Sequence, residues 1–543
     1  MGKQKEYPVR FTPRGLSDAW DSTNTFPGAC KSLQNLIFDQ SNPELVVARP
    51  GVDAPITSFA GFTTPTVVTG YTVIGDFVYG MVSTGATYGC DEPFCYNLVN
   101  NVFIAISGVT SGNVPTSPSI YGDIVPLSFA VIGIQLVITH PGFSGVGSNF
   151  FGVIDITNPA FPAWSSKNTT TNLLPSVPTA VANFNNRAWY ICGNTAHYSD
   201  VLTGTVITNA GQSLTIGDAS PLVALTGLPI QTSSAGVVSS LIAFKKMQIW
   251  QILGDASVTG SLSLNFLALN IGCIAPNSIV QTPIGTIFAG IDGPYYLSSL
   301  GQVLPLTKDS NKTVQDLQKP FQNIVNPGWA NGAFTGSIYR ICMDSVINGA
   351  SATNDYWFDS DVRRWSGPHT FPYDSISAYS SYFIISHRSL GAKLFKSQYL
   401  PTQSSHYNDN GSDIKVLLQP AFLSKGSNIN VKEVIESTIE LSSLSSFTNY
   451  TITAFDEKFN TLSAVNIGVS NPLTFWGGGQ VWGGGLLWNS ASNNVYTFPI
   501  PWDSPLIFQK LTLTVQAVAS YGLSIGTSFN KFRDCGYTTV IQA

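Results

Sequence analysis

The sequence predicts an all-β protein: a β-propeller of about six to seven blades, preceded by an N-terminal segment and followed by a C-terminal β-sandwich-like domain. Three observations support this fold class. Charged residues make up only 10% of the 543 residues, whereas exposed helix faces usually carry Glu, Lys and Arg. Glycine (49) and proline (32) are frequent, as in chains with many turns. Short runs of β-branched and aromatic residues alternate with these turn residues along most of the chain.

The N-terminal segment is expected to cover residues 1–60 and to include a strand that closes the propeller ring. Ring closure commonly uses one end of the chain to complete a blade that the other end began. The candidate closing strand is "PELVVARPGV", residues 43–52.

The propeller is expected to cover residues 61–405, where one pattern recurs: an apolar strand, a polar turn and a second, aromatic strand. Successive copies start roughly 44 to 57 residues apart, close to the period of four-stranded propeller blades. A sheet with two apolar faces is not soluble alone, and radial packing of blades buries both faces. The copies lie near residues 75, 132, 187, 243, 287, 338 and 382.

One short helix is expected within the propeller region, in "TKDSNKTVQDLQKPF", residues 307–321. Asp309 or Ser310 is the expected N-cap, and Pro320 is expected to end the helix.

The C-terminal domain is expected to cover residues 406–543, after the polar linker "QSSHYNDNGSD". Its strands alternate apolar and polar residues, as in a β-sandwich with one wet face per sheet. Within it, "FWGGGQVWGGGLLWN" places Trp476, Trp482 and Trp488 six residues apart between triple glycines. The favoured interpretation is that the three rings plug a hydrophobic seam. The alternative is an exposed tip that contacts another subunit or a host surface.

Several functional classes are disfavoured by the sequence. The N-terminus "MGKQKEYPVRF" lacks the apolar region of a signal peptide, and "LSFAVIGIQLVITH" is too short to cross a bilayer. No basic region is long enough to grip a nucleic-acid backbone. The seven cysteines lack zinc spacing, and no metal or other cofactor is expected. Cys90 and Cys95 have the spacing to bridge across a turn, although free thiols are the favoured interpretation.

The most charged stretch is "NDYWFDSDVRRWSG", residues 354–367, which invites a catalytic interpretation. Glycosidase chemistry needs two carboxyl groups about 5–10 Å apart across a cleft. The turn interpretation is favoured: Asp359 and Asp361 would accept backbone N–H bonds, while Arg363 or Arg364 pairs with an acid or lies over Trp365. The sequence offers five candidate acids: Asp292, Asp344, Asp355, Asp359 and Asp361.

Five segments together resemble the nozzle, or tail tubular, proteins of short-tailed bacteriophages. They occur in the order that such proteins show, and the resemblance covers most of residues 25–400. The segments are "SLQNLIFDQSNPELVVARPGV", "NNRAWYICGNTAHYSD", "LIAFKKMQIWQILGD", "GCIAPNSIVQTPIGTIFAGIDGPYYLSSLGQVLPLT" and "YWFDSDVRRWSG".

The resemblance implies a structural virion protein rather than an enzyme. It implies a homo-hexameric ring below portal and adaptor proteins, assembled in the bacterial cytoplasm and located in the virion tail. Double-stranded viral DNA would pass through the lumen without sequence-specific binding. Tail fibres or spikes would attach around the ring, and the host surface is a further expected contact. The net charge of −5 fits a wall that does not hold phosphates.

Two alternatives remain open at this point. One is a carbohydrate-binding or glycan-hydrolysing β-propeller, such as a tail-borne receptor-binding protein, with aromatic patches that stack sugars. The other, less favoured, is a cellular propeller that serves as a docking platform.

Overall fold

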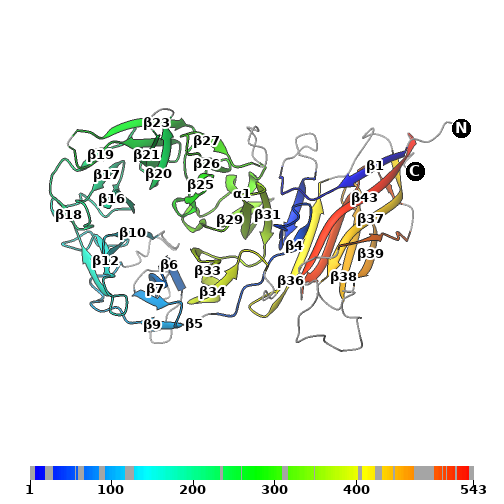
Figure 1. The fold of residues 1–543 in the computed structure, drawn as a ribbon, viewed down its shortest axis with the longest axis horizontal. Helices are drawn as coiled ribbons and strands as arrows, with labels where there is room; N and C mark the ends of the chain where they lie inside the picture. Colours follow the sequence, from blue (N-terminus) through cyan, green and yellow to red (C-terminus); the bar gives the residue numbers. More distant parts are fainter. Residues whose placement is uncertain are drawn as a thin grey trace. The chain divides into compact units, whose positions relative to one another are not determined.

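The protein is built almost entirely of β-strands, as predicted, in a computed structural model (Figure 1). The chain divides into two compact units. Unit one comprises Met1–Ala54, Tyr356–Phe371 and Ser397–Ala543, and unit two comprises Pro55–Asp355 and Pro372–Lys396. The structure describes residues 6–18, 28–55, 57–58, 67–84, 92–115, 127–232, 236–258, 260–307, 316–347, 349–401, 407–421, 431–443, 447–469, 495–503, 506–508, 510–519 and 522–536.

Unit two is a β-propeller, which confirms the predicted fold class. Six four-stranded antiparallel sheets form separate blades, within the described residues. Their strands are β6 (Val67–Ile74), β7 (Phe77–Ser83), β8 (Glu92–Asn97), β9 (Val102–Ile104); β10 (Ser128–Ile132), β11 (Gln135–Thr139), β12 (Phe151–Asp155), β13 (Ala163–Lys167); β15 (Ala180–Phe184), β16 (Arg187–Cys192), β17 (Thr195–Tyr198), β19 (Ser213–Thr215); β20 (Ala224–Thr232), β21 (Gly236–Phe244), β22 (Gln248–Leu253), β23 (Ser263–Leu269); β24 (Val280–Thr282), β25 (Gly285–Ala289), β26 (Pro294–Leu297), β27 (Val303–Pro305); and β32 (Ser375–Tyr379), β33 (Tyr382–Ser386), β34 (Lys393–Gln398), β5 (Thr57–Ser58).

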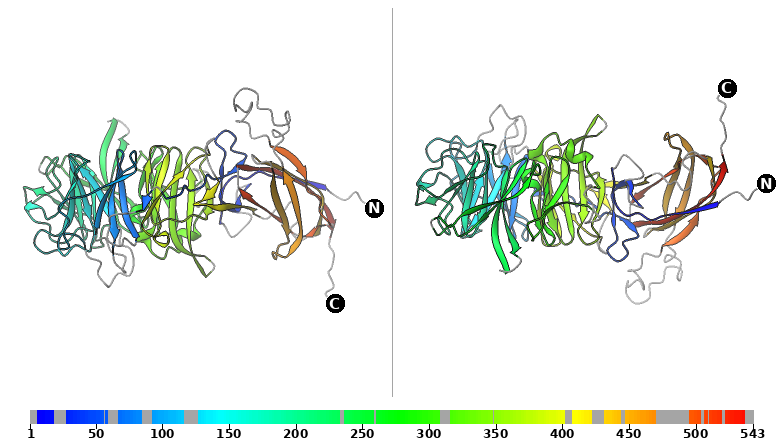
Figure 2. Two further views of the ribbon diagram at one scale, coloured as in Figure 1. Left: turned by 90° about the horizontal axis from the view of Figure 1, so that it is seen from below. Right: turned by 90° about the horizontal axis from the view of Figure 1, so that it is seen from above.

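Three further strands of unit two are the first strands of a longer sheet. They are β28 (Asn331–Thr335), β29 (Ile338–Ile347) and β30 (Ala350–Asp359), and the division between the units falls inside β30. Figure 2 shows unit two edge-on, with the strands of successive blades crossing the thickness of the disc. One short parallel pair lies outside the blades, between β14 (Thr170–Thr171) and β18 (Val206–Ile207).

The apolar faces of neighbouring blades pack on one another, which is the arrangement that the two-faced strand pattern requires. In one cluster, Trp189 and Ile191 of β16 pack with Leu241 and Ala243 of β21 and with Ile252 of β22. Four other buried clusters likewise take residues from two adjacent sheets. The fold therefore has a core between each of these pairs of blades rather than one central core.

The ring closes as expected through a strand within residues 1–60, but the candidate segment 43–52 is not that strand. β5 closes it, because Thr57 and Ser58 pair with Leu394 and Lys393 of β34. Val46–Ala48 instead forms β4, which pairs with β3 (Leu36–Phe38) and β43 (Leu523–Gly536) in unit one. All three β4 side chains are buried, so this short apolar strand suits the interior of a sheet better than the rim of a blade.

Unit one contains two antiparallel sheets and gathers both ends of the chain. In one sheet β3, β4, β43 and β37 (Val431–Ser443) are neighbours in that order, followed by β40 (Tyr496–Pro499). β1 (Glu6–Phe11) also pairs with β43, and β41 (Ile507–Phe508) with β37. The other sheet runs in the order β31 (Arg364–His369), β2 (Cys30–Gln34), β36 (Ser412–Pro420), β42 (Thr512–Ala519), β38 (Thr448–Phe455) and β39 (Thr461–Val469), with β35 (Asn408–Asp409) on β36.

The two sheets of unit one face each other. The hydroxyl of Tyr450 on β38 donates to the backbone oxygen of Ser442 on β37. Burial alternates along β38, as predicted for strands with one wet face, and also along β36 and the second half of β42. The expected boundaries at 60 and 405 differ from those of the units, because the N-terminal strands and residues 356–371 also belong to unit one.

Within the described part of the predicted helix, the helical residues form one turn, α1 (Lys319–Gln322). Pro320 lies in its first turn, where a missing N–H costs no hydrogen bond, rather than ending the helix. The expected caps Asp309 and Ser310 lie outside the described residues.

His140, directly after β11, should make the stability of the protein depend on pH. The ring is buried, its Nδ1 accepts the N–H of Gly142 at 2.9 Å, and burial lowers the pKa of His140 to about 4. The unfolded chain takes up this proton near pH 6.5, so stability is lost as pH falls from about 6.5 towards 4. The expected loss is about 2 kcal/mol at pH 4.5.

The substitution His140→Asn tests this linkage, because its amide oxygen can still accept the Gly142 N–H. Urea unfolding at pH 7 and pH 4.5 should show a smaller pH-dependent loss in the variant than in the wild type. An equal loss in the two proteins would show that His140 does not cause the pH-dependent loss of stability.

Candidate functional site

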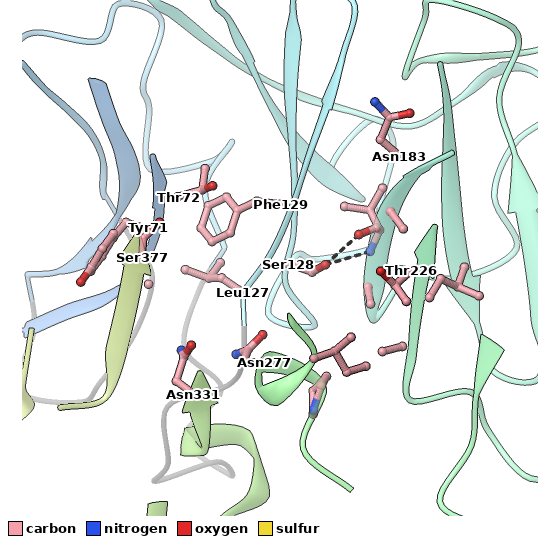
Figure 3. A pocket seen from close by; sticks show the side chains of 18 of the residues that line it. Tyr71, Thr72, Leu127, Ser128, Phe129, Asn183, Thr226, Asn277, Asn331 and Ser377 are labelled. Atoms are coloured by element: carbon pink, nitrogen blue, oxygen red, sulfur yellow. Dashed lines mark hydrogen bonds between the residues drawn. The ribbon is translucent and has the colours of Figure 1, made fainter. Parts of the chain in front are cut away.

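The inner strands of unit two surround an axial cavity of about 440 Å³ (Figure 3). Among the described residues, seven inner segments contribute to its lining. They are β6, β10, β15, β20, β28, β32 and the segment formed by β24 with the short 3-10 helix η1 (Pro276–Ser278). Because these strands are far apart in sequence, the cavity exists only once the ring has closed.

Side chains connect the inner strands, whose inward edges have no main-chain partner. The Ser128 hydroxyl on β10 donates to the Val181 oxygen on β15 at 2.9 Å, and the Val181 N–H donates back at 3.1 Å. Asn183 Nδ2 donates to the Val131 oxygen at 2.6 Å across the same two blades. These bonds satisfy backbone groups that a propeller would otherwise leave open at its centre.

The cavity lining is polar but carries no Asp, Glu, Lys, Arg or His among the described residues. Its hydrogen-bonding side chains are amides and hydroxyls: Thr69, Tyr71, Thr72, Ser128, Thr179, Asn183, Thr226, Asn277, Gln281, Asn331 and Ser377. This part of the chain also holds no group of three His, Cys, Asp or Glu residues placed to bind a metal. The described lining residues thus offer no carboxyl pair for glycoside hydrolysis.

Asp359 closes the turn between β30 and β31, which confirms the turn interpretation for this residue, whereas Asp361 contributes its backbone N–H. Its Oδ1 accepts the N–H groups of Asp361 at 2.9 Å and Val362 at 3.3 Å. Gln40 Nε2 donates to its Oδ2 at 2.9 Å. Burial raises the pKa of Asp359, and the two backbone hydrogen bonds oppose that rise. Both carboxylate oxygens of Asp359 accept hydrogen bonds, and those from Asp361 and Val362 stabilise the turn.

The same side-chain-to-backbone hydrogen bond recurs at or just after the end of the third strand in other blades. Asp359 therefore belongs to a feature that the blades repeat. In each case a side-chain oxygen accepts the backbone N–H two residues later: Asn97 from Val99 at 2.9 Å, Asp155 from Thr157 at 2.9 Å, Asp255 from Ser257 at 2.8 Å, and Ser298 from Leu300 at 3.3 Å. The sequence carries this signal as Asn, Asp or Ser at or shortly after the end of an apolar strand.

The two arginines of this stretch have different roles. Arg364 lies over the ring of Phe38, 5.1 Å from its centroid, rather than over Trp365. It also donates to the backbone oxygen of Pro43. Arg363 has φ of 52°, so it supplies the left-handed residue of the turn.

The other three candidate acids are each held in separate contacts. Asp355 forms a buried ion pair with Arg340 at 2.6 Å, and Arg388 binds Asp344 at 2.7 Å. Asp292 lies in an exposed turn and accepts the Tyr295 hydroxyl at 2.8 Å. These contacts are structural, and none of these acids lines the cavity.

A buried polar network in unit one escaped the sequence analysis. Arg49 donates to Asn35 Oδ1 at 2.9 Å and forms a two-bond ion pair with Asp409, at 2.9 and 2.5 Å. Asn35 in turn accepts the N–H of Thr370 at 3.0 Å, and its own N–H donates to His369 Nδ1 at 3.1 Å. Asn35 has φ of 56°, a conformation that asparagine tolerates well. The network joins three segments that are far apart in sequence.

Gly51 follows the Arg-Pro pair of this network. A Cβ there would lie 2.0 Å from the Asn408 oxygen, so only glycine fits.

The predicted tryptophan cluster and one of the two cysteines considered for a disulfide lie outside the described residues. Trp476, Trp482 and Trp488 are outside the described part of the chain, as is Cys90. Cys95 is a buried free thiol, and burial raises its pKa to about 12. Within the described residues, no helix is both long and apolar enough to span a membrane.

Comparisons with known proteins find distantly similar structures, including propellers, but no matching family. No protein-family model and no curated protein matches the chain. The WD40 β-propeller domain of Doa1 is 10% identical, with a TM-score of 0.34, covering 62% of this chain and 97% of that domain. An exo-β-1,3-galactanase from Phanerochaete chrysosporium is 12% identical, with a TM-score of 0.27, covering 89% and 99%. A β-fructofuranosidase from Schwanniomyces occidentalis is 9% identical, with a TM-score of 0.24, covering 90% and 98%.

These likenesses are too distant to carry an argument about activity. The propeller assignment rests on the sheet topology of the chain itself.

Proposed function

We propose that this chain is a structural virion protein, a nozzle or tail-tube component of a short phage tail. Several copies would form a ring-shaped channel that retains and then releases DNA below the portal and adaptor proteins. The observation that carries the proposal is the axial cavity at the centre of the propeller, whose described lining has no charged residue and therefore no carboxyl pair. A closed propeller without such a pair suits a wall element.

The DNA channel would lie between copies of the chain rather than along the propeller axis. A cavity of about 440 Å³ has the size of a small-molecule site, which is commonly about 300–1,000 Å³. A DNA duplex cannot pass through such a space. The homo-hexamer that the resemblance implies would provide a wider lumen on its own symmetry axis.

The charge of the chain is compatible with DNA moving past it. Lys and Arg number 26 against 31 Asp and Glu, giving a net charge of −5. DNA carries about one negative charge per 1.7 Å of helix axis, so a basic wall would hold it through its phosphates. A mildly acidic wall leaves the duplex free to slide. Tail fibres or spikes and the host surface are the further proposed partners.

The alternative, a carbohydrate-binding or glycan-hydrolysing propeller, divides into two cases. Hydrolysis needs two carboxyl groups facing one substrate, and four of the five candidate acids (Asp292, Asp344, Asp355 and Asp359) are engaged in a turn, in ion pairs or with a tyrosine. Binding without hydrolysis needs only neutral hydrogen-bonding groups, which the axial cavity has.

Sedimentation of the purified chain, alone and with the portal–adaptor complex of its virus, tests the proposal. We expect a particle of about six copies of the 58.2 kDa chain, at least when the adaptor ring is present. The control is the same mixture without the adaptor. A chain that sediments as a monomer in both samples would contradict the proposed role.

A further inference from the structure

The polar side chains that line the axial cavity suggest a ligand. Asn277, Thr72 and Ser377 line the cavity, and their half-buried side chains are accessible to an occupant. Asn277 lies on η1, which contacts β28, the strand that carries Asn331. Figure 3 shows Asn277 and Asn331 at one side of the cavity and Asn183 at the other. The cavity therefore presents polar groups from several blades to whatever occupies it.

The same lining selects against charged occupants. A carboxylate or ammonium group entering the cavity would lose hydration without meeting an opposite charge, because the described lining has none. Amide groups, by contrast, both donate and accept, and hydroxyl groups do the same. A ligand whose own groups are hydroxyls can pair with both kinds of side chain.

Apolar side chains complete the site. Leu127, Phe129, Ile279 and Ile376 also line the cavity, and Phe129 is only half-buried. A sugar ring combines hydroxyl edges with C–H faces, and such faces pack well on apolar and aromatic side chains. The cavity volume of about 440 Å³ falls in the usual range for small-molecule sites.

We propose that the axial cavity of the propeller binds a small uncharged saccharide, either free or as the end residue of a glycan chain. Asn277, Asn331 and Ser377 would hydrogen-bond its hydroxyl groups, while Leu127 and Phe129 contact its C–H face. The inference does not depend on the proposed assembly role. It concerns the interior of one propeller, whereas assembly concerns the outside.

Saturation-transfer NMR and calorimetry with the full-length chain test this site. The neutral probes are glucose, galactose, mannose, rhamnose and N-acetylglucosamine, and the charged ones are glucuronic acid and glucosamine. At least one neutral sugar should bind, and its charged analogue at least tenfold more weakly. The matching trisaccharides distinguish a chain end from a free sugar, and binding of either form supports the site.

Two substitutions at Asn277 locate the binding. Asn277→Leu keeps the number and branching of the side-chain heavy atoms and removes the amide, so the dissociation constant should rise at least tenfold. Asn277→Trp fills space in the cavity and should abolish binding. Asn100→Leu, in the exposed turn between β8 and β9, is the matched control and should bind as the wild type does.

The proposal is overturned if no neutral sugar binds at tens of millimolar, if charged analogues bind equally well, or if Asn277→Leu binds as tightly as the wild type. The leucine variant decides the matter if the tryptophan variant does not fold. Because assembly is measured separately by sedimentation, a ring that forms but binds no sugar refutes only this inference. A monomer that binds sugar refutes only the assembly role.

Discussion

Replacing Arg49 with methionine is expected to destabilise the protein by about 3–5 kcal/mol. The guanidinium is 2% exposed and forms two bonds with Asp409, whose side chain is 12% exposed. It also donates to Asn35 Oδ1. Methionine fits the space of the arginine stem but leaves a buried carboxylate and an amide oxygen without this partner. Urea unfolding, followed by a spectroscopic signal from unit one, measures the loss.

Two further variants test whether the loss of stability in Arg49→Met comes from the buried ion pair. Arg10→Met removes an exposed ion pair with Glu44 by the same substitution, and its expected cost is below about 1 kcal/mol. The double variant Arg49→Met with Asp409→Leu should recover part of the loss, because no unpaired carboxylate remains. If Arg49→Met costs no more than Arg10→Met, the network does not stabilise unit one.

Replacing Trp189 with alanine is expected to destabilise unit two by about 3–5 kcal/mol. The ring is fully buried, with its centroid 4.6 Å from that of Tyr198 and 6.3 Å from that of Phe184. It belongs to the cluster in which two neighbouring blades meet. The substitution opens a cavity between the blades, so it tests whether contact between blades stabilises the ring. The measurement is the denaturant midpoint of the propeller.

Phe161→Ala is the matched control for Trp189. Phe161 is 79% exposed in the turn between β12 and β13, and its loss should change stability by less than about 0.5 kcal/mol. Equal effects of the two substitutions would contradict the view that packing between blades holds the propeller together.

The sequence was most informative where structure is local. The low charge, the frequent turn residues and the repeated strand pairs predict blades, because each blade is a meander of neighbouring strands. The turn at Asp359 was likewise predictable, since its bonds reach only two or three residues along the chain. Period-two alternation predicted the wet face of β38 in the same way.

Features that join distant segments could not be predicted from patterning. The pair Arg49–Asp409 spans 360 residues, and nothing near Arg49 indicates its partner. The closing strand β5 has only two residues, too short for any periodicity, so the longer apolar segment 43–52 was the more prominent candidate. The axial cavity could not be predicted for the same reason: its lining comes from inner segments spread between Thr69 and Ser377.

The position of DNA in an image of the assembled particle tests the account most directly. The account predicts about six copies around one axis, with a lumen between them wide enough for a duplex. The central cavity of each propeller should hold no DNA. Density for DNA running through a propeller centre, or particles that contain only a single copy, would contradict it.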